Sequence, residues 1–89
     1  MKHKLEQITK HFGIKNQIIK LNEEVGELTY ECANREYFGI QEELADVITL
    51  LKQIQIYFEI EDAEIEAVMN EKVNRTLKRI KEGYYDEHR

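Results

Sequence analysis

The chain has 89 residues, of which 42% are hydrophobic and 35% are charged, and its formal net charge is −5. This length suits one small domain over residues 1–89, and the acidic balance argues against a protein that binds nucleic-acid polymers through a basic surface. The only cysteine, Cys32, excludes an intrachain disulfide and fits a reducing cytoplasm. No apolar run has the length of a membrane span, so no membrane partner is expected.

The spacing of apolar residues predicts an all-α chain, an antiparallel bundle of about four helices. There is no proline and there are only four glycines, which favours long helices. Gly13 suits the end of the first helix, and Gly39 is available for an unusual backbone angle. Asp62 is expected to cap the last helix. The predicted helices cover residues 3–12, 15–33, 41–58 and 62–82, with residues 34–39 as a connection.

The second predicted helix carries one apolar seam. Its members are spaced by alternating steps of four and three, as expected for one buried face of a helix. These residues are Ile14, Ile18, Leu21, Val25, Leu28 and Cys32.

The third predicted helix is apolar nearly all round. From Leu44 to Phe58, ten of fifteen residues are apolar or aromatic: Leu44, Ala45, Val47, Ile48, Leu50, Leu51, Ile54, Ile56, Tyr57 and Phe58. Such a helix must be buried on most sides, and three short companions would struggle to enclose it. We therefore expect a homo-oligomer, a dimer or a dimer of dimers, with this helix at an isologous interface. The alternative is a monomer with an apolar surface, although large exposed patches are uncommon on soluble monomers.

Two pairs of acidic residues lie beside these seams. Glu24 and Glu27 each precede a seam residue on the second helix, and Glu43 and Asp46 do the same on the third. If the two helices pack antiparallel, the four carboxylates meet, and such a group disfavours full ionisation. A hard divalent cation reverses that penalty, and an all-oxygen ligand set favours Mg²⁺ or Mn²⁺ over Zn²⁺. Asp is a poor helix-interior residue, so its place at position 46 adds weight to this interpretation.

The two acidic motifs carry a family resemblance. The sequence "EEVGE" (residues 23–27), a gap of fifteen residues and "ELAD" (residues 43–46) resemble the EExxE and ExxD signature of the MazG-like nucleoside triphosphate pyrophosphohydrolases. These belong to an all-α superfamily that also includes dimeric dUTPases and phosphoribosyl-ATP pyrophosphohydrolases. The similarity extends over residues 14–85. It implies a helical bundle that dimerises, and in some members forms a tetramer.

The resemblance also implies roles for individual residues. Glu23 and Glu24 are the implied catalytic residues, with Glu23 orienting a water molecule or holding a second metal ion. The implied Mg²⁺ ligands are Glu24, Glu27, Glu43 and Asp46.

The basic residues of the last helix are less sharply assigned. Lys72 matches a basic position that contacts substrate phosphates in the family, and Asn74, Arg75 and Arg79 compete for the positions that follow. Lys72, Arg75 and Arg79 fall on one helix face, which suits a triphosphate tail. The alternative is an ordinary cationic last turn favoured by the helix dipole. Gln17 shares the carboxylate face of the second helix and is a candidate contact to a nucleobase, or else a solvated polar residue.

The predicted function is that of a cytoplasmic, Mg²⁺-dependent hydrolase that converts nucleoside triphosphates to the monophosphate and pyrophosphate, in nucleotide-pool house-cleaning. The chain lacks a GxxxxGK loop, which argues against the usual machinery for γ-phosphoryl transfer. The choice of the bond between the α and β phosphates follows from the resemblance. The alternative is a non-catalytic acidic helical module that binds a partner through residues 41–58.

Overall fold

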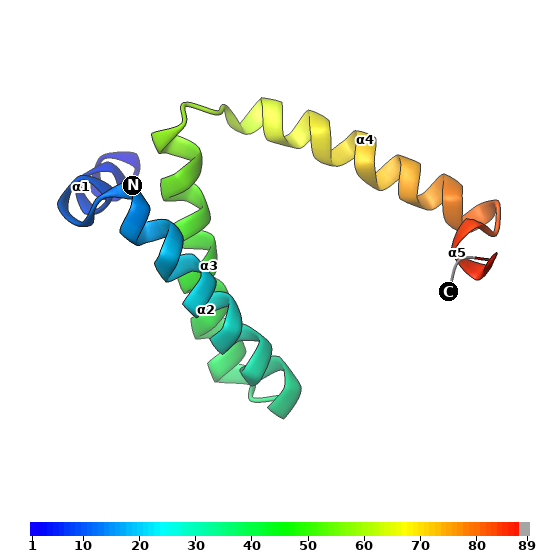
Figure 1. Cartoon of the computed structure of the whole chain (residues 1–89), viewed down its shortest axis with the longest axis horizontal. Coiled ribbons are helices and arrows are strands. Elements are labelled where there is room, and N and C mark those ends of the chain that lie inside the picture. The colour runs from blue at the N-terminus through cyan, green and yellow to red at the C-terminus, as the bar shows by residue number, and fades with distance from the viewer. Residues whose placement is uncertain (88–89) are drawn as a thin grey trace. The chain divides into compact units, whose positions relative to one another are not determined.

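The computed structural model describes residues 1–87, and all the regular elements in that range are α-helices (Figure 1). The helices are α1 (Lys2–Phe12), α2 (Ile14–Asn34), α3 (Tyr37–Tyr57), α4 (Asp62–Lys81) and α5 (Tyr84–Glu87). The all-α class is therefore confirmed, and the short α5 is an element that the sequence did not predict. None of the helices in the described range is long and apolar enough to cross a membrane.

The chain divides into two compact units, which are described separately. The first is Met1–Glu59, with α1, α2 and α3, and the second begins at Ile60 and holds α4 and α5. The paired carboxylates lie in the first unit. The basic residues of the predicted last helix lie in the second.

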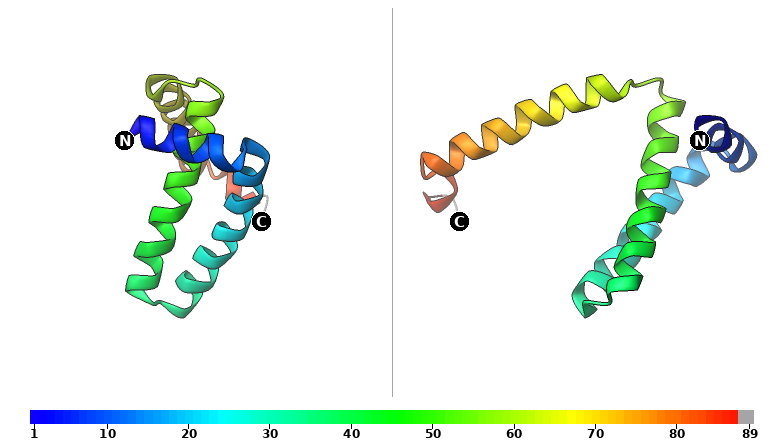
Figure 2. Two further views of the ribbon diagram at one scale, coloured as in Figure 1. Left: turned by 90° about the vertical axis from the view of Figure 1, so that its left-hand side faces the viewer. Right: turned by 180° about the vertical axis from the view of Figure 1, so that it is seen from behind.

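The helices α2 and α3 form an antiparallel hairpin with a two-residue turn, Arg35 and Glu36 (Figure 2). Arg35 takes the left-handed conformation that ends α2, with φ 56°, and its N–H donates to the carbonyl of Cys32. The expectation of an unusual angle at Gly39 is wrong, because this residue lies in the first turn of α3. Its lack of a side chain instead makes room for the carboxylate of Glu31, which a Cβ at this position would meet.

The contact face of α2 contains more polar residues than the sequence indicated. Ile18 and Val25, two members of the predicted seam, are 44% and 43% exposed, and Cys32 is exposed as well. That part of the seam prediction is wrong, because polar side chains occupy the positions that lie against α3. The buried and half-buried residues of α2 are Ile14, Gln17, Leu21, Glu24, Leu28 and Glu31.

On α3, one apolar side is covered and another is not. Val47 and Leu50 are buried in the hairpin. Leu44, Ile48 and Leu51 recur at steps of four and three, so they form one stripe, and they are 43%, 46% and 48% exposed. We call these three residues the apolar stripe. Within the first unit α3 is therefore enclosed on one side only.

The first helix lies across the open end of the hairpin, where it runs over α3 (Figure 2, left). It buries Leu5 and Thr9. The prediction that Gly13 ends the first helix is confirmed, because its N–H donates to the carbonyl of Thr9 at 2.7 Å. The φ of Gly13 is 88°, an angle that glycine adopts without strain, and it lets α2 start at the next residue.

In the second unit, α4 begins one residue earlier than a cap at Asp62 would place it. Glu61 is the N-cap residue, and its N–H donates to the carboxylate of Glu64 at 2.8 Å. Gly83, with φ 73°, then separates α4 from α5. The guanidinium of Arg79 lies 5.0 Å from the centre of the Tyr84 ring, a cation–π contact that links the two helices.

Candidate metal centre

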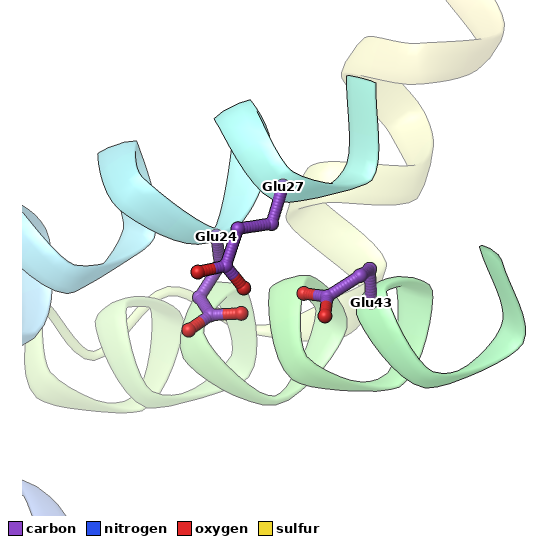
Figure 3. Close-up of side chains that lie close together, drawn as sticks. All are labelled: Glu24, Glu27 and Glu43. Atoms are coloured by element: carbon purple, nitrogen blue, oxygen red, sulfur yellow. The ribbon is translucent and has the colours of Figure 1, made fainter. Parts of the chain in front are cut away.

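Three carboxylates from two helices converge inside the hairpin (Figure 3). Glu24 and Glu27 lie three residues apart on α2, which places them on neighbouring turns of one face. Glu43 reaches them from α3, because the short turn fixes the register of the two helices. One oxygen from each of the three side chains lies within 4.8 Å of the others.

The neighbouring side chains do not neutralise all the negative charge of these carboxylates. The side chain of Glu24 is buried, and Oε2 of both Glu24 and Glu43 is buried without a hydrogen-bond partner among the described residues. A hydrogen bond to Glu24, reinforced by burial and by the charge of Glu27, raises the pKa of Glu43 to about 7. The same bond, together with Lys20, lowers the pKa of Glu24. Between the lowered pKa of Glu24 and the pKa of about 7 of Glu43, the pair therefore holds one proton between its two carboxyl groups.

The donor set fits a hard divalent cation. All three side chains offer oxygen, and two of their buried oxygens have no other partner in the described part of the chain. A buried acceptor without a donor is costly, and a cation would take the place of the shared proton and satisfy both oxygens. Mg²⁺ usually binds a few carboxylates and keeps several waters, so three glutamates are sufficient for it.

Two predicted acidic residues lie apart from this group. Asp46 is exposed on α3, about one turn after Glu43, and is not among the carboxylates that gather. Glu23 is exposed on α2, next to Glu24 in the chain. Their assignments as metal ligand and catalytic residue remain predictions.

The predicted phosphate-binding residues lie on α4 in the second unit. Lys72 and Arg75 are both exposed, and their spacing of three places them on one face of the helix. Arg79 is less available than the sequence implied, because its guanidinium lies over the ring of Tyr84.

Gln17 belongs to a buried polar cluster rather than to the solvated surface. Its Nε2 donates to Gln53 Oε1 at 2.8 Å. The Thr9 hydroxyl lies 3.0 Å from the same oxygen and 2.9 Å from the carbonyl oxygen of Leu5, and its single proton is donated to one of the two. All three side chains are buried. Neither Thr9 nor Gln53 was a candidate from the sequence. The available signal for Gln53 was its position in the apolar part of the third predicted helix, three residues after Leu50 and one before Ile54.

Comparisons of the chain with protein-family models, with curated proteins and with solved structures found no match. The grounds for assigning a function are therefore the geometry of the carboxylates and the resemblance of the two motifs.

Proposed function

We propose that the chain is a Mg²⁺-dependent nucleoside triphosphate pyrophosphohydrolase of the MazG-like type. The observation that supports this most directly is the convergence of Glu24, Glu27 and Glu43, with two buried oxygens that lack partners in the described residues. A solvated acidic helix face has no reason to direct carboxylates into the contact between two helices, because their mutual repulsion opposes folding. A site built for a divalent cation does.

Each acidic residue has a role in this proposal. Glu24, Glu27 and Glu43 would hold the cation, with Asp46 as a fourth ligand by resemblance. The bound cation, Mg²⁺ or Mn²⁺, supplies neutralisation of phosphate charge and a bound water of lowered pKa. Glu23 lies beside this group in the chain and remains exposed, so its carboxylate is free to orient a water and accept its proton.

The substrate's phosphates and the bond that breaks are assigned by resemblance. Lys72 and Arg75 bind the β and γ phosphates through charge-assisted hydrogen bonds. Cleavage falls between the α and β phosphates, so the products are a nucleoside monophosphate and pyrophosphate. Cationic side chains on the leaving pyrophosphate stabilise the charge that develops on it.

We also propose that the active form is a homo-oligomer. The apolar stripe of Leu44, Ile48 and Leu51 supports this, because a second copy of α3 laid against it would bury three side chains that are now more than two-fifths exposed. An isologous contact of this kind uses the same surface on both subunits. The assembly is then a dimer, or a dimer of dimers.

Product analysis tests the enzymatic proposal. With Mg²⁺ and a panel of nucleoside triphosphates, phosphorus NMR should show a monophosphate and pyrophosphate. The change Glu43→Gln should abolish this reaction, and the matched change Glu42→Gln, at an exposed neighbour, should leave it intact. Orthophosphate with nucleoside diphosphate would overturn the assigned bond. Activity that survives Glu24→Gln and Glu43→Gln together would overturn the site.

A second function is favoured by one observation, the exposed apolar stripe itself. A non-catalytic acidic module would use the same three residues of α3 to bind a different protein. Such a module needs no cation. Absence of any Mg²⁺ or Mn²⁺ effect on stability, together with a monomeric state in solution, would favour it over the enzyme.

A further inference from the structure

One side of α4 is apolar and is not covered within the second unit. Its members recur at steps of three and four residues, so they share one face of the helix. Five of the six are between 49% and 58% exposed, and none of the residues of α4, which the structure describes throughout, is buried. Most helical stability in proteins comes from packing of such a face, so this one needs a partner. We call it the α4 face: Ile65, Val68, Met69, Val73, Leu77 and Ile80.

The charges of α4 are segregated along its length. From Asp62 to Glu66 every charged residue is acidic, and from Lys72 to Lys81 every charged residue is basic. The helix dipole favours this order in the first and last turns, but it does not account for Glu66, Lys72 and Arg75, which lie outside them. A parallel copy of α4 would place like charges side by side. An antiparallel copy places the acidic end of each helix beside the basic end of the other.

The apolar residues match in the same antiparallel arrangement. When two copies of α4 cross with their midpoint beside Val73, Ile65 lies opposite Ile80 and Val68 lies opposite Leu77, because each of these pairs is equidistant from that midpoint. Val73 then lies next to its own copy at the centre. The α4 face is therefore self-complementary in its charges and in its apolar residues, as an isologous contact requires.

The contact proposed through α3 is small for a stable dimer. Stable interfaces use roughly 20–30 residues on each side, whereas the apolar stripe supplies three. The α4 face would add six residues from each copy. A membrane surface suits this face less well, because anionic lipids attract basic segments and would repel the acidic end of α4.

We propose that α4 pairs antiparallel with α4 of a second copy of the chain, and that this contact and the one through α3 hold the same oligomer together. The two α4 faces are buried against each other, with the acidic end of each helix beside the basic end of its partner. This inference rests on the proposed homo-oligomer and not on the enzymatic reaction. Because both contacts are needed, a change in α4 should separate the subunits just as a change in the apolar stripe should.

Light scattering at micromolar concentration tests the contribution of α4. Val73→Asp should lower the mass at least twofold, because it brings two carboxylates together in an apolar contact. Ala67→Asp is the matched control and should leave the mass unchanged, since Ala67 is exposed and lies two residues from both Ile65 and Met69, on the other side of the helix. An unchanged mass for Val73→Asp would overturn the inference and leave the α3 contact in place. A monomer before any mutation would overturn the proposed oligomer itself.

Cross-linking identifies the partner and its direction. In a Cys32→Ser background, the Ile65→Cys and Ile80→Cys proteins are mixed in urea, refolded together and treated with a short bis-maleimide. The antiparallel contact should link the two variants to each other and neither of them to itself. Ala67→Cys, at nearly the same level of the helix but on its other side, should not be linked to Ile80→Cys.

The other results of this experiment would overturn the inference. Links within each variant alone would show a parallel pair. An oligomer without links in any mixture would show that a surface other than α4 covers the α4 face. Sedimentation with phosphatidylserine vesicles that Val73→Asp abolishes, again without links, would assign the face to a membrane surface.

Discussion

One carboxyl oxygen of Glu24 lies within 4.8 Å of one of Glu43 across the contact between α2 and α3, and Oε2 of each residue is buried and has no hydrogen-bond partner in the described range. One proton between two carboxyl groups is the arrangement that relieves their repulsion without a cation. Proton and cation therefore compete for the same place. This competition makes the site testable without knowledge of the substrate.

We expect Mg²⁺ or Mn²⁺ to stabilise the folded protein. A ligand that binds only the native state at a hundred times its Kd contributes about 2.7 kcal/mol, which is several degrees in the Tm of a chain of this size. Glu24→Ala should abolish the shift, because it removes a buried ligand oxygen. Glu42→Ala, at an exposed neighbour of Glu43, should leave the shift unchanged. A melting temperature that does not respond to either cation in the unmodified protein would contradict the metal site.

The stability of the metal-free protein should fall as the pH rises from about 4.5 to about 7. In the folded state the pKa of Glu43 is raised from its ordinary value of 4.5 to about 7, so in this interval the native state binds more protons than the unfolded chain. The lowered pKa of Glu24 acts in another range, where stability is lost as the pH falls below 4.5.

Urea denaturation at about pH 5 and about pH 8 measures this dependence. Glu43→Gln should flatten the slope between those two values, since it removes the titrating group. With saturating Mg²⁺ the trend should reverse, because the cation binds the deprotonated carboxylates and stabilises more as the pH rises. A metal-free stability that increases over the same interval would contradict the shared proton.

The apolar stripe predicts an oligomer in solution. Light scattering at micromolar concentration should give the mass of a dimer or a tetramer. Ile48→Asp should dissociate it, because an unpaired charge in an apolar interface costs several kcal/mol. The side chain of Ile48 is 46% exposed in the single chain, so the variant should retain its helical circular dichroism. Thr49→Asp, at an exposed position next to it, is the control that should remain oligomeric. A folded monomer before any mutation would refute the interface.

Two glycines of the first unit should respond in opposite directions to alanine. Gly26 lies within α2, and a Cβ there meets no atom within 4 Å, so Gly26→Ala should stabilise the protein by about 1 kcal/mol. Gly13 has φ 88°, and Gly13→Ala should destabilise it by about 1–3 kcal/mol. Chemical denaturation of the two variants provides the comparison. Equal effects would show that the turn between α1 and α2 relaxes.

The helices and the carboxylate group could be predicted from the sequence because both depend on the spacing of residues along one helix. Residues three apart share a helix face wherever the helix is placed, so Glu24 and Glu27 could be paired in advance. Adding Glu43 needed only the assumption that α2 and α3 pack antiparallel. Asp46 was included by the same logic, and its exposed position shows the limit of a helix-face argument, which does not fix how far one helix is rotated against another.

The polar cluster of Thr9, Gln17 and Gln53 could not be predicted from the sequence, because its members are far apart in the chain. Gln17 and Gln53 are separated by 36 residues, and Thr9 and Gln53 by 44. Periodicity indicates which residues of a helix turn inward, but it assumes that those residues are apolar. Gln17 and Gln53 are buried and hydrogen-bond to each other across two helices, so they do not meet that assumption. The same substitution of polar for apolar residues explains why Ile18 and Val25 were wrongly assigned to the buried seam.

The turn at Arg35 and Glu36 has a consequence for how this chain tolerates changes in length. From Glu24 to Glu43 the chain is helical except at those two residues, so it contains no loop that would absorb an extra amino acid. One residue inserted within either helix turns everything beyond it by about 100°, which would carry a carboxylate out of the group. Residues 58–61, between α3 and α4, do not belong to the segment from Glu24 to Glu43. Insertions and deletions in homologous sequences are therefore expected at residues 58–61, and not between Glu24 and Glu43.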